Sequence, residues 1–249
     1  MEKKLKYLVV IPARYSSTRL PGKPLINIHG LPMIIRTCKQ CLKSVPSKNL
    51  IVATDDKRVL KCCEKSGIRT LLTSSKCLTG TDRVAEVARK IKVKHYINVQ
   101  GDEPIFNPND LKKIIKETFS KKDEILLGYT KIRKKSDYNN KSIPKVVFDK
   151  NNHLLYASRA SIPSSKKNKF IQSWRQVLTY SFPRKKLLEF ASNKKKSNFE
   201  KFEDIEILRF LEMGYKVKLI KMSSKSFSID TKKDLKLIRK FLSNKQNKK

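Results

Sequence analysis

Three cations in one loop and two distant carboxylates are the residues of this chain best suited to chemistry. Arg14, Arg19 and Lys23 fall within a short loop that also contains serine, threonine and glycine. Cations neutralise phosphate oxygens, and small residues let the backbone come close to them. The loop therefore suits a polyphosphate site. It also suits an ordinary solvated basic loop, because it lacks the GxxxxGK[ST] pattern of a P-loop.

The two carboxylates are Asp102, in the string VQGDEP, and Asp230, in SIDTKKD. Each is expected after a strand, at the carboxyl edge of a sheet. Two carboxylates that face phosphates there would hold a hard divalent cation such as Mg²⁺. Asp230 also fits a plain helix N-cap. A Gly-Asp-Glu-Pro turn after a buried strand has less structural need for its acids, so Asp102 is the stronger metal-ligand candidate.

The first half of the chain must position these residues, and its pattern alternates between strands and helices. A buried strand over residues 7–11 is expected to break at Pro12 into the basic loop. The same signals predict strands over 49–53, 69–73 and 94–99, and helices over 33–44, 57–66, 83–91 and 107–121. This order predicts an α/β fold with a doubly wound, mostly parallel sheet that binds ligands at the carboxyl ends of its strands.

The second half is richer in hairpins but remains part of the same domain. The pattern predicts strands over 123–132, 145–149, 153–156, 174–182 and 216–221, and helices over 185–192, 203–213 and 232–242. We interpret residues 1–249 as one domain, with a hairpin-rich insertion at about 123–182.

Composition limits the classes of partner. The net charge of +36 raises a nucleic-acid or anionic-membrane hypothesis. The lysines are spread along the chain without aromatic interleaving or a zinc-finger or RNP signature, which favours a solvated lysine surface and no specific nucleic acid. No apolar run approaches the roughly 18 residues of a membrane span. We expect a cytoplasmic protein whose five cysteines, including Cys38 and Cys41, are reduced, small buried hydrophobes.

The strings IPARYSSTRLPGKPL, TGTDRVAEV, NVQGDEP, YASRASIP and SIDTKKDL occur in this order between about Tyr7 and Phe241. In them the chain resembles the cytidylyltransferases that activate 3-deoxy-manno-octulosonate (Kdo) in lipopolysaccharide biosynthesis. The resemblance implies a Rossmann-like nucleotide-diphospho-sugar transferase fold. It also implies a reaction of CTP with a 2-keto-3-deoxy sugar acid that needs Mg²⁺ and releases pyrophosphate. It further implies a homodimer, with the hairpin-rich part binding sugar and forming the interface.

The resemblance also implies roles for individual residues. Arg14, Lys23 and Asp102 would be catalytic, and Asp102 and Asp230 would bind the metal. The residues implied for nucleotide binding are Ala13, Arg14, Arg19, Lys23, Thr79, Gly80 and Arg83. Those implied for sugar binding are Gln100, Arg159, Gln176, Tyr180 and Glu206.

The departures from the family pattern are expected to cluster around the sugar. The family string HLGIYGY reads QVLTYSF over residues 176–182, which changes its histidine to Gln176 and its glycines to Leu178 and Ser181. In EQLRFLE the glutamine becomes Ile207, which would remove hydrogen bonds to a hydroxylated sugar. Outside this region, Cys77 stands where the family often has histidine, and Asp82 replaces a glutamate.

The acceptor therefore stays open between Kdo, an amino-Kdo and another ulosonic acid. Two other hypotheses are a nucleotidyltransferase for a different acidic sugar and a nucleic-acid-binding protein on a retained nucleotidyltransferase fold. The presence of both the cations and the carboxylates argues against the nucleic-acid hypothesis.

Overall fold

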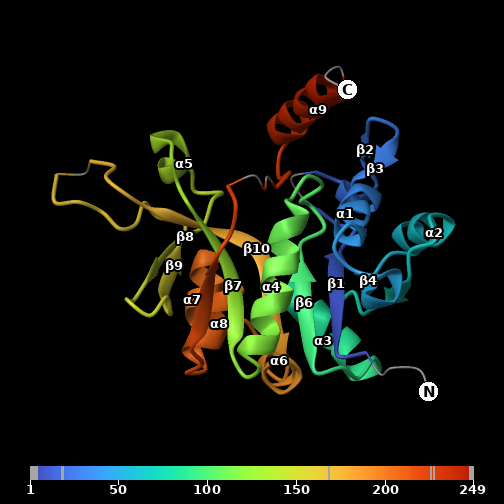
Figure 1. Ribbon diagram of the computed structural model, residues 1–249, viewed down its shortest axis with the longest axis horizontal. Helices are drawn as coiled ribbons and strands as arrows, with labels where there is room; N and C mark the ends of the chain where they lie inside the picture. Colours follow the sequence, from blue (N-terminus) through green and yellow to red (C-terminus); the bar gives the residue numbers. More distant parts are fainter. Residues whose placement is uncertain (1–4, 18–19, 168, 225, 227, 247–249) are drawn as a thin grey trace.

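The computed structural model describes residues 5–17, 20–167, 169–224, 226 and 228–246. Its centre is a mixed sheet with the strand order β11-β7-β10-β6-β1-β4-β5 (Figure 1). These strands are β1 (Tyr7–Ala13), β4 (Leu50–Thr54), β5 (Thr70–Leu72), β6 (His95–Val99), β7 (Ile125–Lys131), β10 (Trp174–Pro183) and β11 (Val217–Lys221). β10 runs antiparallel to both neighbours, while the other adjacent pairs in this order are parallel. The predicted mostly parallel α/β sheet is confirmed.

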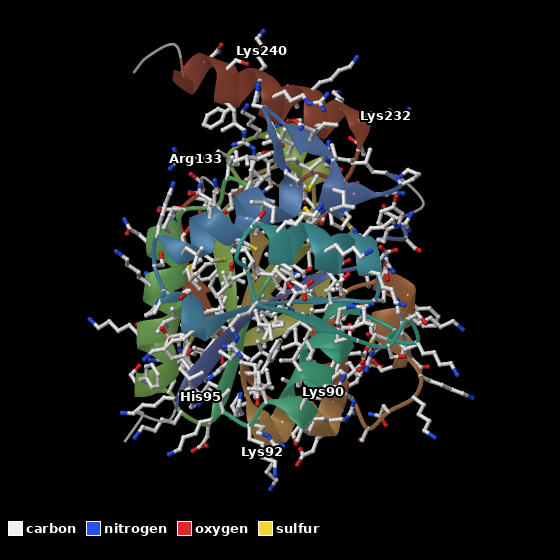
Figure 2. The ribbon with its side chains drawn as sticks, turned by 90° about the vertical axis from the view of Figure 1, so that its right-hand side faces the viewer. Lys90, Lys92, His95, Arg133, Lys232 and Lys240 are labelled. Atoms are coloured by element: carbon white, nitrogen blue, oxygen red, sulfur yellow. The ribbon has the colours of Figure 1, made fainter. Side chains whose placement is uncertain are left out.

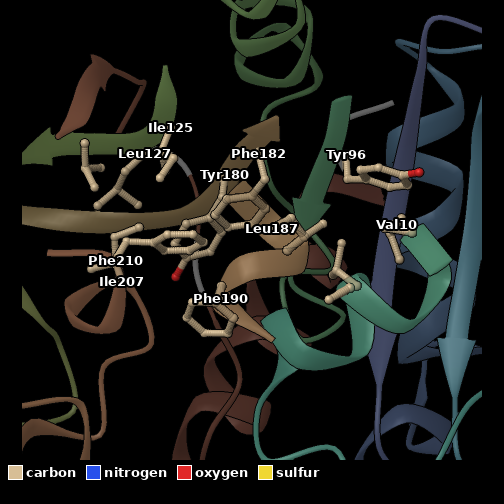
Figure 3. Close-up of a cluster of buried hydrophobic side chains, with 14 of the residues drawn as sticks. Val10, Tyr96, Ile125, Leu127, Tyr180, Phe182, Leu187, Phe190, Ile207 and Phe210 are labelled. Atoms are coloured by element: carbon tan, nitrogen blue, oxygen red, sulfur yellow. The ribbon is translucent and has the colours of Figure 1, made fainter. Parts of the chain in front are cut away.

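Helices cover both faces of the sheet. Successive residues of a strand point to opposite faces, and in the buried strands the residues on both faces are apolar. Leu8 and Val10 of β1 join one hydrophobic cluster, and Val9 and Ile11 join another. The first cluster includes side chains of α3 (Gly80–Lys90), α6 (Arg184–Phe190) and α8 (Ile207–Glu212). The second includes side chains of α1 (Met33–Leu42), α2 (Lys57–Lys65) and α4 (Pro108–Ser120). Figure 3 shows the first cluster.

The second half adds strands to the main sheet and a hairpin beside it. β7 and β10 lie within the sheet, whereas β8 (Lys145–Phe148) and β9 (Leu154–Ser158) form an antiparallel hairpin. β8 pairs with the start of β10, and the hairpin lies beside the main sheet (Figure 1). The smaller elements are β2 (Asn27–Ile28), β3 (Leu31–Pro32), η1 (Lys23–Leu25), η2 (Ser47–Asn49), α5 (Lys135–Asn139), α7 (Asn198–Glu203) and α9 (Lys232–Gln246). In the described part of the chain, no helix is long and apolar enough to cross a bilayer.

Two sequence predictions about these elements are wrong. The first strand does not break at Pro12, because its pairing with β4 continues to Ala13. The pairing with β6 ends at Val10, and a proline is tolerated where one ladder has ended. The predicted helix over 203–213 is shorter in the structure, where α8 begins only at Ile207, because Asp204 adopts a left-handed conformation with φ 51° after the end of α7.

A buried arginine ties these late helices to the first half of the chain. The side chain of Arg209 is fully buried, and its Nε donates to Glu200 Oε2 at 2.6 Å while Nη1 donates to Asp82 Oδ1 at 2.9 Å. The guanidinium also lies over the ring of Phe190, at 3.8 Å from the centroid. The guanidinium of Arg209 therefore links α8, which carries it, to α3, α6 and α7.

Replacing Arg209 by alanine is expected to lower the free energy of unfolding by about 3–5 kcal/mol, because Asp82 and Glu200 would be left buried without their counter-ion. Chemical denaturation followed by circular dichroism measures this. The control Arg133→Ala removes an exposed arginine and should change stability by less than about 0.5 kcal/mol. A loss below about 1 kcal/mol for Arg209→Ala would contradict this interpretation.

Candidate active site

A cavity of about 240 Å³ lies at the carboxyl edge of the sheet, where the segments that follow β1 and β6 meet the N-terminus of α3. Asp230, two residues before the start of α9, also lines this cavity. The sequence-predicted residues that line the cavity are Ala13, Arg14, Lys23, Thr79, Gly80, Arg83, Gln100, Asp102, Glu206 and Asp230. Arg19 lies outside the residues that the structure describes.

Lys23 connects the two predicted metal-binding carboxylates. Its Nζ lies 2.7 Å from Asp102 Oδ2 and 3.1 Å from Asp230 Oδ1. Burial lowers the pKa of Lys23, but the attraction of the two carboxylates outweighs it, so the pKa is raised and the ammonium stays charged. The backbone N–H of Ile229 donates to the carbonyl of Asp102 at 3.0 Å, which fixes the two acidic segments side by side.

The chemistry of this pair fits a divalent cation. Asp102 Oδ1 is buried and has no hydrogen-bond partner among the described residues. Its other oxygen and Asp230 Oδ1 already share one cationic group, the ammonium of Lys23. Across the described ranges, no group of three or more His, Cys, Asp or Glu side chains could hold a metal by itself. Two carboxylates nevertheless suit Mg²⁺, which protein sites often bind through one or two carboxylates together with substrate phosphates.

The N-terminus of α3 forms another wall of the cavity. The carboxylate of Glu206 accepts hydrogen bonds from the backbone N–H of Gly80 and of Thr81, each at 2.9 Å, and from the Thr81 hydroxyl. Burial raises the pKa of Glu206, and these hydrogen bonds oppose that rise. Glu206, which the resemblance assigns to the sugar, therefore also holds the turn that presents Thr79 and Gly80 to the cavity.

Arg83 is held by the strand ends beside it. Its Nη2 donates to Asp55 Oδ2 at 2.9 Å, and its Nη1 donates to Thr73 Oγ1 at 2.5 Å. The guanidinium is buried, so its orientation toward the cavity is fixed by these partners. Asp55 belongs to the string ATDD, which the sequence analysis did not assign to the site.

Several lining residues were missed by sequence reasoning. Cys77 lines the cavity, and its thiol donates to Glu86 Oε2 at 3.3 Å, so it is more than a small buried hydrophobe. Lys196 and Asp204 also line the cavity and form an ion pair at 2.6 Å. They come from a lysine run and from the break between α7 and α8, and neither feature resembles a binding motif. The remaining unpredicted lining residues are Pro12, Ser17, Pro24, Met33, Leu78 and Gly101.

Three predicted sugar-binding residues are not among the described residues that line the cavity. Arg159 lies beside it, where its guanidinium donates to the carbonyls of Glu203 at 2.5 Å and Asp204 at 2.9 Å. Gln176 and Tyr180 are buried together, and Gln176 Nε2 donates to the tyrosine hydroxyl at 2.6 Å. Burial raises the pKa of Tyr180 well above its usual value, so the phenol stays protonated.

Two of the family departures that were expected around the sugar are buried in the protein interior. Ile207 is 1 % exposed and packs in the same hydrophobic cluster as Tyr180 and Phe210 (Figure 3), because the first turn of α8 turns it toward the core. Ser181 is fully buried and accepts a hydrogen bond from the Thr118 hydroxyl on α4 at 2.8 Å. The side chain of Leu178 lies outside what the structure describes.

Comparisons with known proteins agree with this geometry. A family model described as cytidylyltransferase matches residues 8–248. A 3-deoxy-manno-octulosonate cytidylyltransferase of Thermodesulfovibrio yellowstonii is 37% identical over 250 residues, which cover 94% of this chain and 97% of the relative. A mitochondrial enzyme of the same name from Arabidopsis thaliana is 34% identical, over 92% of this chain and 80% of its own length.

Solved structures extend the likeness to three dimensions. A CMP:2-keto-3-deoxy-manno-octonic acid synthetase complexed with CTP superposes with a TM-score of 0.88 at 30% identity, over 97% of this chain and 100% of that chain. A thymidylyltransferase from Bacillus anthracis, 13% identical over 94% of each chain with a TM-score of 0.69, shares the fold alone. From its match to the family model and its identity to these relatives, the chain belongs to the cytidylyltransferase family, among the 3-deoxy-manno-octulosonate cytidylyltransferases.

Proposed function

We propose that this chain transfers CMP from CTP to the anomeric hydroxyl of a 2-keto-3-deoxy sugar acid, with Kdo as the acceptor, and releases pyrophosphate. The observation that carries the proposal is the meeting of Arg14, Lys23, Asp102 and Asp230 in one cavity beside the N-terminus of α3. Four charged groups of this kind suit a nucleoside triphosphate with its metal. The relatives bear the name of this reaction, and the neighbouring structure contains CTP.

In this reaction the anomeric oxygen attacks the α-phosphorus in line. The bond from the α-phosphorus to the pyrophosphate oxygen breaks, its electron pair leaves with pyrophosphate, and the proton of the anomeric hydroxyl passes to water. Asp102 and Asp230 would hold Mg²⁺, which supplies charge neutralisation to the triphosphate when bound. Arg14 and Lys23 bind and neutralise the phosphates, so positioning and electrostatics supply most of the catalysis.

Lys23 has two roles in this proposal. Without substrate its ammonium neutralises Asp102 and Asp230, which would otherwise repel one another. With a metal-bound triphosphate present, the same ammonium reaches phosphate oxygens. The residue therefore holds the carboxylates close together until the nucleotide arrives.

The part of the site expected to bind the sugar acid is more polar than the departures from the family pattern suggested. Ile207 and Ser181 are structural, which leaves Gln176 as the described departure beside the predicted sugar residues. Gln176 Oε1 is buried without a hydrogen-bond partner among the described residues, although Gln176 does not line the cavity. Gln100 and Glu206 line the cavity itself and are the candidates for direct sugar contact. These groups fit a hydroxylated ulosonic acid.

A homodimer is part of the same proposal. Leu155 on β9 is 62 % exposed, and Phe199 and Phe202 on α7 are 50 % and 77 % exposed. The rings of Tyr156 and Phe199 meet edge to face at 5.9 Å, so the hairpin packs against α7. Exposed aromatic surface of this kind is typical of subunit interfaces. The hairpin-rich part of the chain, at about 123–182, would contribute to this interface within a single domain.

An enzyme with this role would act in the cytoplasm, in lipopolysaccharide biosynthesis.

Replacing Asp102 by asparagine should lower turnover at least about 100-fold, because the lost charge weakens metal binding and the stabilisation of the transition state. Pyrophosphate release from CTP, Mg²⁺ and Kdo measures this. The control Asp123→Asn makes the same change on the exposed surface and should leave the rate within about twofold. Near-normal turnover of Asp102→Asn would show that this carboxylate has no part in the reaction.

An acceptor panel tests the substrate assignment. With saturating CTP and Mg²⁺, Kdo is expected to support pyrophosphate release at least about tenfold faster than N-acetylneuraminate, because the site would be shaped around an eight-carbon acid. An amino-substituted Kdo belongs in the same panel and measures how the Gln176 region discriminates. If CTP binds by calorimetry and no ulosonic acid releases pyrophosphate, the acceptor assignment is wrong.

The dimer is tested by Leu155→Lys combined with Phe202→Lys. Sedimentation velocity should show a dimer for the unaltered protein and a monomer for the double variant, because lysines at the centre of an apolar interface remain unpaired. The control Leu72→Lys places a lysine on another exposed apolar position, in β5 at the far edge of the sheet, and should remain dimeric. A double variant that still sediments as a dimer would exclude this surface as the interface.

A further inference from the structure

The C-terminal helix α9 is fixed to the body of the protein by one face only. Ile238 is buried in a cluster with Ile28, Met33 and Ile229, and Leu235 and Leu242 pack against the same cluster. A ring nitrogen of His29 lies 2.8 Å from the Arg239 carbonyl, and the Arg239 guanidinium donates to the carbonyl of Asn27 at 2.7 Å. These contacts hold the helix against the β2–β3 hairpin in a defined orientation.

The solvent-exposed side of α9 carries apolar side chains among lysines. Leu237 is 59 % exposed and Phe241 is 51 % exposed, and their i,i+4 spacing places them side by side on the helix. Lys233, Lys236 and Lys240 are exposed on the same side of the helix at spacings of three and four residues. The helix therefore presents a stripe of cations beside an apolar edge, on the side away from the core. We call Lys233, Lys236, Leu237, Lys240 and Phe241 the outer face of α9.

This end of the molecule carries further positive charge. Figure 2 shows Lys232 and Lys240 of α9 at the same end as Arg133, which precedes α5, whereas Lys90 and Lys92 lie at the opposite end. Lys134 and Lys135 follow Arg133 and are also exposed. Two segments far apart in sequence thus add cations to one end of the protein.

We propose that the outer face of α9 binds an anionic lipid surface, with Leu237 and Phe241 entering the headgroup boundary and the lysines pairing with lipid phosphates. Helices with lysines beside leucine and phenylalanine bind bilayers in this way without crossing them. A second copy of this chain fits the face poorly, because both copies would bring the same lysines against one another. A soluble polyanion would pair with the lysines but would leave the two apolar side chains in water.

The placement of α9 gives such a contact a consequence for the site. Asp230 lies two residues before the first residue of α9, and Ile229 belongs to the cluster that the helix covers. A bilayer that holds α9 would therefore hold the protein with the carboxyl edge of its sheet facing the lipid. This inference is independent of the proposed acceptor, since it concerns only the surface of the helix.

Vesicle flotation tests the proposal. The full chain should float with vesicles that contain 30 mol % phosphatidylglycerol in phosphatidylcholine, and should not float with pure phosphatidylcholine. Leu237→Gln combined with Phe241→Gln should lower the partition coefficient at least about tenfold, because apolar burial contributes to interfacial binding. Lys236→Gln combined with Lys240→Gln should lower it roughly fivefold for each lysine. Thermal melting by circular dichroism checks that each variant stays folded.

The matched control is Lys90→Gln combined with Lys92→Gln, which removes the same charge at the opposite end of the molecule (Figure 2). It should float like the unaltered protein. An equal loss in this control would overturn the proposal in favour of diffuse attraction by the net charge. Full binding by the Leu237/Phe241 variant would overturn it in favour of a purely electrostatic polyanion site. Lipid-free self-association that this variant abolishes would show that the face joins two copies instead.

Discussion

The salt bridge from Lys23 to Asp102 and Asp230 is the interaction on which the rest of the site depends. It brings together a loop after the first strand, a turn after β6 and the segment that leads into the last helix. Two carboxylates this close repel each other unless a cation lies between them, so the lysine is what allows the pair to exist before substrate binds. The mixed sheet supplies the geometry, because it ends β1 and β6 side by side at one edge.

A second set of charged residues fixes the start of α3 on the other side of the cavity. Arg209 pairs with Asp82 and Glu200 in the interior, and Glu206 accepts the first backbone N–H groups of α3. The late helices thereby fix the helix start that carries Thr79 and Gly80 into the cavity. The positions of the predicted nucleotide-binding residues at the start of α3 thus depend on residues that lie more than a hundred positions later in the chain.

Much of this could be predicted from sequence, because the cavity is built where strands end and the local strings mark those ends. Arg14 and Asp102 each follow a buried strand within three residues, and Lys23 lies in the segment that follows the first strand, so their common edge follows from the alternation of elements. The direction in which the Ile207 side chain points could not be predicted in this way. The left-handed conformation of Asp204 delays the start of the expected helix, so Glu206 lines the cavity while Ile207, the first residue of α8, enters the core.

The tight packing around Gly80 restricts how this site can change over evolution. A Cβ atom at this position would lie 3.3 Å from Pro12 Cγ and 3.4 Å from both Gln100 Nε2 and Glu206 Oε1. Those three atoms belong to the end of β1, the segment after β6 and the residue before α8, so one added methyl group would contact all three at once. Substitutions at the outer residues of the cavity are therefore the easier route to a new acceptor preference. A change at its centre would need substitutions in several loops together.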